Sequence, residues 1–589
     1  MSRGPAAARV EAAFERLAEV ERPEAWIELA PEGALADAAR AVDARVATGE
    51  ALPLAGVLLA VKDNVDVAGF PTTAACPAFA YRPGATARAV QRLVDAGALV
   101  LGKANLDQFA TGLVGTRSPY GAVRGVPDPA RISGGSSSGS AVAVALGVAD
   151  VGVATDTAGS GRVPAALTGI VGLKPTRGLV PTAGVVPASR PHDCVSVLAR
   201  TLPEAAAALR VMVGAGPTRT PAAGGRAWHA DVRLAAPPAP RVAVPTGAGL
   251  AALSPAWRAA FDAAADRLGK AGAEVAAVDV SPLLAAGALM YDSALVAERH
   301  AAVGAFVGAH PDDVDPVVGA VIRAAGSYSA PELAAAQARL DGLAAEAAAA
   351  LDGYDALLLP TTPWHPTLAE VAADPVGVNR RLGTYTNFLN LLDMAAAAVP
   401  AGPPGDEGSV GLTVAVRAFD DQVGVDIAAR LLGPAPARTL VTDSAAQGPD
   451  ASPESPLVVA GGHDLVVFGA HMRGEPLNHQ LTDRGARFLA DVVTTDAYRM
   501  YALPTTPPKP GIVAVGAGRG GPLRGERWRL SPAALGAFLA ALPAPMALGT
   551  IALADGTAPT GFLAPASAVA DAGAADITML GGWRAHLAR

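Results

Sequence analysis

The chain has 589 residues, of which 51% are hydrophobic and only 17% are charged. That is enough apolar material for a large core, and the length exceeds one ordinary domain. A formal net charge of −8 argues against a nucleic-acid-binding surface. The two cysteines, Cys76 and Cys194, show neither disulfide nor zinc-ligand spacing, which fits a reducing cytoplasm and indicates no metal site.

The N-terminal segment predicts a helix rather than a signal peptide, because glutamates recur at helical spacing among alanines in residues 11–19. Near the other end, residues 530–554 carry no charge. Pro543 and Pro545 divide this run into a helix and a strand, so we interpret it as core and not as a membrane span. The sequence therefore predicts no membrane association.

The first candidate functional residue is Lys62, which follows the apolar residues 52–61. This run predicts a buried strand that places the amine in a low-dielectric interior. Burial lowers the pKa of a lysine, as a general base requires. The alternative is an ordinary lysine at a strand end whose amine reaches water.

Residues 133–140 read Ser-Gly-Gly-Ser-Ser-Ser-Gly-Ser and could be a flexible linker or a tight loop in a site. The small apolar residues 141–149 follow and predict a closely packed helix, so the loop is fixed within a fold. It is not a phosphate-binding loop of the Walker type, because no Gly-Lys-Ser/Thr closes it.

A third small-residue segment surrounds Ser160, which lies between Gly159 and Gly161. Successive backbone N–H groups of such a turn can point at one spot, which predicts an oxyanion hole formed by Thr157, Ala158, Gly159 and Ser160. The nucleophile-elbow pattern G-x-S-x-G is absent, which argues against an α/β-hydrolase.

Together the three segments resemble the amidase signature family. The resemblance implies a Ser–cis-Ser–Lys triad, with Ser160 as nucleophile, Ser136 as proton relay and Lys62 as base. The family spacing of 24 residues (160 minus 136) selects Ser136 over Ser137 and Ser138, and the peptide bond before Ser136 would be cis.

Further segments extend the resemblance. Residues 105–112 and 118–121 are similar to the substrate channel of the family, which makes Gly112 a candidate substrate-binding residue. Arg162 lies close to Asp156 in sequence, and we interpret it as a structural ion-pair partner rather than a ligand.

Apolar strand runs alternate with alanine-rich helices up to about residue 440, which predicts an α/β domain over residues 1–441. Residues 442–456 are polar, contain prolines and lack periodicity, so they predict a linker. Residues 457–589 begin with a strand-then-turn segment at 465–481 and later contain Gly-Glu-Arg-Trp at 525–528, and with these segments they resemble the γ-glutamyl-cyclotransferase-like fold. The expected architecture is an amidase-signature fold, with a mixed β-sheet core covered by helices, followed by a small α+β barrel-like domain.

This pairing of domains resembles the allophanate hydrolases. The resemblance implies allophanate, a urea that bears a carboxylate, as substrate, and Tyr291 and Arg299 as the residues that hold the carboxylate. On one continuous helix these two would lie about 12 Å apart along the axis and about 80° apart in phase. The alternative is that Arg299 pairs with Glu298 on a surface helix while Tyr291 packs in the core.

In the second domain, four polar residues lie within nine positions after a predicted strand: His471, Arg473, Asn478 and His479. The cluster suggests a pocket for a small anion. The resemblance implies that this domain removes CO₂ from N-carboxycarbamate, and the sequence leaves open which histidine acts.

Two other functions fit parts of the chain: the glutamine-hydrolysing A-type subunit of an aminoacyl-tRNA amidotransferase, and an amidase with a non-catalytic C-terminal binding module. The resemblance implies no cofactor and a homodimer. No biotin-attachment Ala-Met-Lys-Met occurs, so we expect a separate biotin-dependent urea carboxylase as pathway partner. Allophanate arises both in urea use and in triazine breakdown, and the sequence does not distinguish these two pathways.

Overall fold

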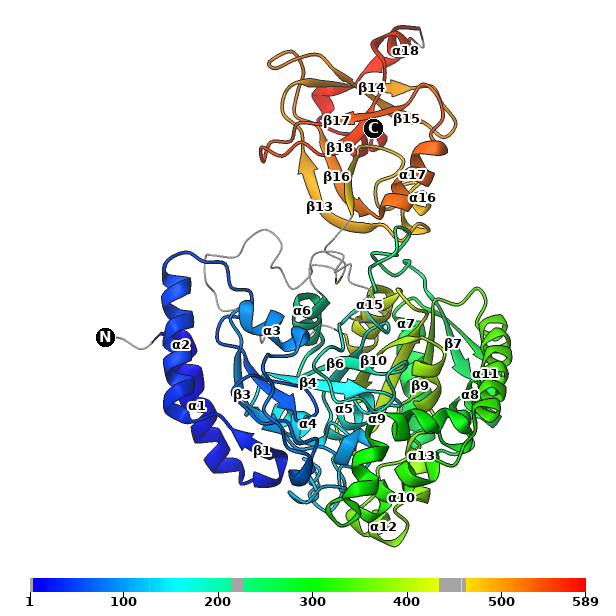
Figure 1. The fold of residues 1–589 in the computed structure, drawn as a ribbon. Coiled ribbons are helices and arrows are strands. Elements are labelled where there is room, and N and C mark those ends of the chain that lie inside the picture. Colours follow the sequence, from blue (N-terminus) through cyan, green and yellow to red (C-terminus); the bar gives the residue numbers. More distant parts are fainter. Residues whose placement is uncertain (1–3, 127, 214–225, 434–456, 458–461, 572) are drawn as a thin grey trace. The chain divides into compact units, whose positions relative to one another are not determined.

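The computed structural model describes residues 4–126, 128–213, 226–433, 457, 462–571 and 573–589. These residues form two compact units, Met1–Ala227 with Ala239–Leu457, and Trp228–Pro238 with Val458–Arg589 (Figure 1). The predicted linker, residues 442–456, lies outside the described residues.

The first unit contains one eleven-stranded sheet in the order β1-β3-β2-β4-β6-β5-β10-β11-β9-β7-β8. The strands are β1 (Trp26–Leu29), β2 (Leu58–Lys62), β3 (Leu99–Ala104), β4 (Val151–Asp156), β5 (Val171–Lys174), β6 (Cys194–Ala199), β7 (Arg241–Pro245), β8 (Glu274–Val278), β9 (Ala356–Pro360), β10 (Ala395–Pro400) and β11 (Gly411–Val416). β2 is parallel to β3 and β4, whereas β4 is antiparallel to β6. The expected mixed sheet is therefore confirmed.

Helices surround this sheet (Figure 1). They are α1 (Pro5–Val20), α2 (Glu32–Ala47), α3 (Arg88–Asp95), α4 (Ser138–Ala145), α5 (Arg162–Thr168), α6 (Leu202–Val213), α7 (Pro255–Lys270), α8 (Ser281–Asp292), α9 (Ala297–Ala309), α10 (Pro316–Ala325), α11 (Ala330–Ala350), α12 (Leu368–Ala373), α13 (Gly377–Leu382), α14 (Asn387–Leu391) and α15 (Asp421–Leu432). α11 begins at a capping box of Ser329 and Glu332, which satisfies two orphan donors of its first turn.

The helix predicted after the Gly/Ser loop is α4, and it packs on β2 and β4. Its residues from Ser138 to Val144 are all buried. Small side chains permit this close approach: a Cβ at Gly139 would lie 2.1 Å from the carbonyl oxygen of Ala25. The loop before α4 is consequently held inside the fold, as the sequence predicts.

The second unit combines a five-stranded sheet in the order β13-β16-β12-β18-β17 with a three-stranded sheet in the order β15-β14-β19. Its elements are β12 (His463–Val467), α16 (His479–Thr482), β13 (Arg487–Val493), β14 (Tyr498–Leu503), β15 (Lys509–Ala514), β16 (Arg524–Leu530), α17 (Pro532–Ala540), β17 (Ala547–Thr550), β18 (Thr560–Leu563), α18 (Ala566–Asp571), β19 (Ala575–Asp576) and α19 (Trp583–Leu587). Residues 530–554 thus supply α17 and β17. Among the described residues, no helix is long and apolar enough to cross a membrane.

Residues 228–238, here called the strap, belong to the second unit although the sequence analysis placed them in the first domain. Leu234 is buried, and its N–H donates to the Gly485 carbonyl at 2.9 Å. The N–H of Ala533, in α17, donates to the Ala230 carbonyl at 2.9 Å. The second unit is therefore assembled from two separate stretches of the chain.

Candidate active site

Lys62 and Ser136 meet in the interior of the first unit. β2 ends at Lys62, whose side chain is fully buried. Its Nζ donates to Ser136 Oγ at 2.8 Å and to Oγ1 of Thr155, in β4, at 2.7 Å. The peptide bond between Gly135 and Ser136 is cis. The alternative of a lysine that reaches water is wrong, because the strand delivers the amine between two buried hydroxyls.

Burial lowers the pKa of Lys62 from its ordinary 10.5 to about 7. The carboxylates of Asp107, Asp156 and Asp193 act in the opposite direction, and the positive charge of Arg299 adds to the lowering. Close to neutral pH the amine is therefore poised between its charged form and the neutral form that can accept a proton.

Ser160 lies in the turn between β4 and α5, and a buried carboxylate shapes this turn. Asp156 accepts hydrogen bonds from the N–H groups of Gly159 at 2.9 Å and Gly161 at 3.1 Å. It also forms an ion pair of 2.8 Å with Arg162, and both side chains are fully buried. Burial would raise the pKa of Asp156, but the charge and hydrogen bonds of Arg162 outweigh it and lower that pKa. The interpretation of Arg162 as a structural partner of Asp156 is confirmed.

The serine turn also lies against the Gly/Ser loop. The N–H of Ser137 donates to the Ser160 carbonyl at 3.3 Å, which holds the two loops side by side. Gly159 has a φ of +131°, and a Cβ there would lie 2.4 Å from Thr386 Oγ1. Only glycine fits without a shift of Thr386.

The four predicted oxyanion-hole residues differ in whether their backbone N–H already donates a hydrogen bond within the protein. The N–H of Gly159 donates to Asp156 and is committed to shaping the turn. In the described part of the chain, the N–H groups of Thr157, Ala158 and Ser160 have no protein acceptor. These three are the candidates to receive a developing oxyanion.

Sequence reasoning missed Asn390, at the C-terminal end of α14. Its Nδ2 donates to the carbonyls of Asp156 at 2.7 Å and His192 at 2.8 Å, and its Oδ1 accepts from Arg162 at 3.1 Å. One buried amide thus braces both members of the ion pair behind the turn. An asparagine among apolar residues carried no sequence signal for this contact.

Tyr291 and Arg299 do meet, and the assumption of one continuous helix is wrong. α8 ends at Asp292, Ser293 is extended with φ −144° and ψ 175°, and α9 begins at Ala297. The break lets the Arg299 guanidinium donate to the Tyr291 hydroxyl at 3.0 Å. Arg299 is only 3% exposed, so the alternative of a surface arginine paired with Glu298 is also wrong.

Arg299 connects this pair to the predicted channel loop. It donates to Thr111 Oγ1 at 3.0 Å, and Gly112 is the next residue. The Asp107 carboxylate shapes this loop by accepting from the N–H of Gly115 at 3.0 Å, and a Cβ at Gly112 would lie 2.6 Å from that carboxylate. Gly112 therefore allows the loop to close beside Arg299.

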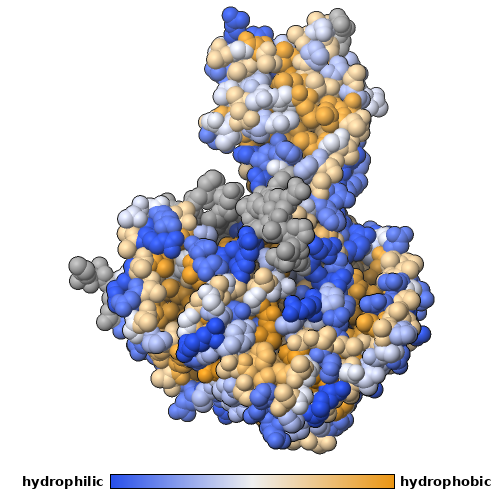
Figure 2. Space-filling model, viewed as in Figure 1, coloured by the Kyte–Doolittle hydropathy of each residue, from blue (hydrophilic) through white to orange (hydrophobic). Residues whose placement is uncertain are grey.

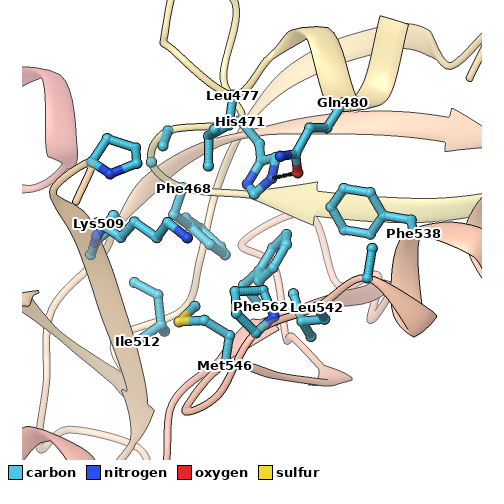
Figure 3. Close-up of a pocket in the computed structure, with 16 residues that line it drawn as sticks. Phe468, His471, Leu477, Gln480, Lys509, Ile512, Phe538, Leu542, Met546 and Phe562 are labelled. Atoms are coloured by element: carbon cyan, nitrogen blue, oxygen red, sulfur yellow. Dashed lines mark hydrogen bonds between the residues drawn. The ribbon is translucent and has the colours of Figure 1, made fainter. Parts of the chain in front are cut away.

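The predicted polar cluster of the second unit is divided by the fold. His471 lines a cavity of about 270 Å³ (Figure 3). Asn478 supports its backbone by donating to the His471 carbonyl at 2.8 Å. Arg473 pairs instead with Glu526 at 3.2 Å, and the exposed His479 contacts the Pro476 carbonyl. Of the four, only His471 faces the cavity.

This fold and site define an amidase, and the chain belongs to the amidase family, since the family model described as Amidase matches residues 8–423. A second model, described as the allophanate hydrolase C-terminal domain, matches residues 463–588.

Over nearly its whole length the chain is similar to Kluyveromyces lactis allophanate hydrolase. The two structures have a TM-score of 0.84 and 35% identity, covering 99% of this chain and 97% of that one. A urea amidolyase of Lachancea kluyveri is 40% identical over 579 residues, and this chain spans 31% of its length. The A-type subunit of the glutamyl-tRNA(Gln) amidotransferase of Deinococcus deserti is 34% identical over 435 residues, covering 67% of this chain and 86% of that protein.

Proposed function

We propose that this protein hydrolyses allophanate, with Ser160 as nucleophile, Ser136 as proton relay and Lys62 as base. The observation that carries the proposal is the 2.8 Å contact between Lys62 and Ser136, formed by an amine whose pKa burial lowers to about 7. The similarity to an allophanate hydrolase over 99% of the chain supports this substrate.

The hydrogen bonds of Lys62 suit a neutral amine. The charged amine donates to both Ser136 and Thr155, whereas the neutral amine can keep its N–H on Thr155 and turn its lone pair to the proton of Ser136. Ser136 in turn takes the proton of Ser160 while the Ser160 oxygen attacks the carbon of the terminal amide. The N–H groups of the serine turn stabilise the oxyanion. Ammonia leaves with a proton returned through Ser136, and water then hydrolyses the acyl-enzyme.

Arg299 and Tyr291 provide the selectivity. A guanidinium fork and a phenol match a planar carboxylate, and the buried position of Arg299 makes each such hydrogen bond stronger than in water. The charge of Arg299 also lowers the pKa of Lys62, which links this pair to the base. The similarity to the amidotransferase protein covers only 67% of this chain, so that function ranks second.

The second unit then receives N-carboxycarbamate and removes CO₂, with His471 as the proton donor, so that ammonia and CO₂ are the overall products. The largely apolar walls around His471 favour loss of CO₂ because they desolvate the leaving carboxylate. We further propose a cytoplasmic homodimer that takes allophanate from a separate biotin-dependent urea carboxylase.

The test is ammonia release from purified protein supplied in turn with allophanate, malonamate and glutamine. Ser160→Ala should abolish both turnover and labelling by a fluorophosphonate. Ser136→Ala should retain a residue of activity, since water can partly replace the relay. Ser137→Ala is the matched control, because its hydroxyl bonds the Thr155 carbonyl and not Lys62. A preference for glutamine, or labelling that survives Ser160→Ala, would contradict the proposal.

A further inference from the structure

The cavity of the second unit is lined by one lysine, Lys509, for which the proposed function names no role. Its walls are largely apolar and include Phe468, Ile512, Phe538, Met546 and Phe562. Three polar side chains also line it, those of His471, Gln480 and Lys509, and none of the lining residues that the structure describes is a carboxylate. Figure 2 shows hydrophobic residues gathered near α17 on the visible face of this unit. An apolar cavity whose charged side chain is a lysine favours a small organic anion.

Lys509 is the first residue of β15 and follows His471 by 38 positions in sequence (509 minus 471), yet its side chain reaches into the same space as His471 (Figure 3). It is only partly exposed. Within the described ranges, its amine has no ion-pair or hydrogen-bond partner. The Lys509 charge also acts on the His471 ring, whose pKa is lowered mainly by burial. A half-buried ammonium without a partner is suited to bind an anion.

His471 is held in one orientation. Its ring stacks on Phe562 with centroids 5.1 Å apart and meets Phe538 edge-on at 5.2 Å. Its Nε2 lies 3.1 Å from Gln480 Oε1. An amide oxygen only accepts hydrogen bonds, so Nε2 carries a hydrogen and Nδ1 is the nitrogen that gains or loses the second proton.

We propose that Lys509 is the specificity-determining residue of the second unit and binds the carboxylate that stays on the product, while Gln480 positions His471. This inference rests on the decarboxylation proposed above. One C–N bond of N-carboxycarbamate breaks, its electron pair stays on nitrogen, and nitrogen takes a proton from His471. CO₂ leaves, the carbamate product stays bound through its carboxylate to the Lys509 ammonium, and water returns the proton to His471.

The experiment uses the full chain and ¹³C-labelled allophanate, with ammonia and the ¹³C species followed together. Lys509→Met should lower the ratio of CO₂ to first ammonia and let N-carboxycarbamate accumulate, because a charged hydrogen bond is worth about 10- to 150-fold in affinity. Lys509→Arg should restore most of the ratio. Malonate, which has the same two carboxylates on carbon, should inhibit the second step of the wild type and not of Lys509→Met.

Arg519→Met is the matched control, because it removes an exposed cation of the same unit outside the cavity and should leave the ratio unchanged. Gln480→Leu should move the pH dependence of the second step to lower pH, because Gln480 raises the pKa of His471. If Lys509→Met matches the wild type while His471→Ala accumulates N-carboxycarbamate, the role of Lys509 is refuted and the proposed function stands. If neither variant slows CO₂ release, the proposed decarboxylation itself fails.

Discussion

Replacement of Lys62 by methionine should remove activity and stabilise the fold at neutral pH. The pKa of Lys62 is about 7 in the folded protein and 10.5 as an ordinary lysine, so the unfolded chain binds the extra proton between these values. The free energy of unfolding should therefore rise with pH across this window. Below about pH 7 both states are protonated, and the buried charge costs its full penalty.

The difference between the two pKa values corresponds to a penalty of about 5 kcal/mol below pH 7 and about 3 kcal/mol at pH 8. Lys62→Met removes this penalty, but the hydroxyls of Ser136 and Thr155 each lose their hydrogen bond with the amine. Each lost hydrogen bond costs about 1 kcal/mol of stability. The variant should accordingly be the more stable protein by about 2 kcal/mol near pH 7, with the advantage vanishing at about pH 9.

The assay measures the free energy of unfolding in urea for the wild type and for Lys62→Met at several pH values. The difference between the two proteins removes the contribution of titratable groups that both contain. In parallel, kcat/KM of the wild type should rise about tenfold from pH 6 to its plateau, with a midpoint near 7, as the amine becomes neutral. A variant that is less stable by the same amount at every pH would refute the depressed pKa. A flat rate profile with chemistry limiting would refute lysine as the base.

Three further substitutions test individual contacts. Arg299→Lys should raise KM for allophanate about 10- to 150-fold and change KM for a neutral amide little, because a point charge replaces the guanidinium fork. Equal losses of activity on the two substrates would mean that the arginine only supports the fold. Gly159→Ala should lower kcat about 100-fold or more, because the new methyl group displaces the turn that carries Ser160. Gly169 also has a positive φ, +72°, but open space around its Cα, so Gly169→Ala should lower stability and leave kcat unchanged. Leu234→Asp should lower the melting temperature of the second unit while ammonia release continues, and calorimetry showing no change would mean that the strap does not stabilise that unit.

The sequence predicted best what is local in the chain. Each member of the proposed triad ends an apolar strand or lies in a glycine-rich turn, and both patterns can be recognised in the sequence. The buried helix after the Gly/Ser loop was predicted for the same reason. These features depend on backbone geometry over fewer than about ten residues.

Features that depend on a break in a helix or on distant parts of the chain were not predictable. Tyr291 and Arg299 meet because the chain breaks at Ser293, which no periodicity signalled. Lys509 joins the cavity from a strand far along the sequence from His471, whereas Arg473, only two residues away from that histidine, turns to Glu526. Closeness in sequence was a poor guide wherever a loop reverses direction.

The strap has a consequence for the order of events on the ribosome. Its last residue, 238, is synthesised 225 residues before β12 begins at residue 463 (463 minus 238). At about 5–20 residues per second, this interval lasts roughly 11–45 s. During that time the Leu234 N–H and the Ala230 carbonyl have been synthesised, while Gly485 and Ala533, the residues that they hydrogen-bond in the finished protein, have not. The second unit can therefore mature only after translation has passed through the whole first unit.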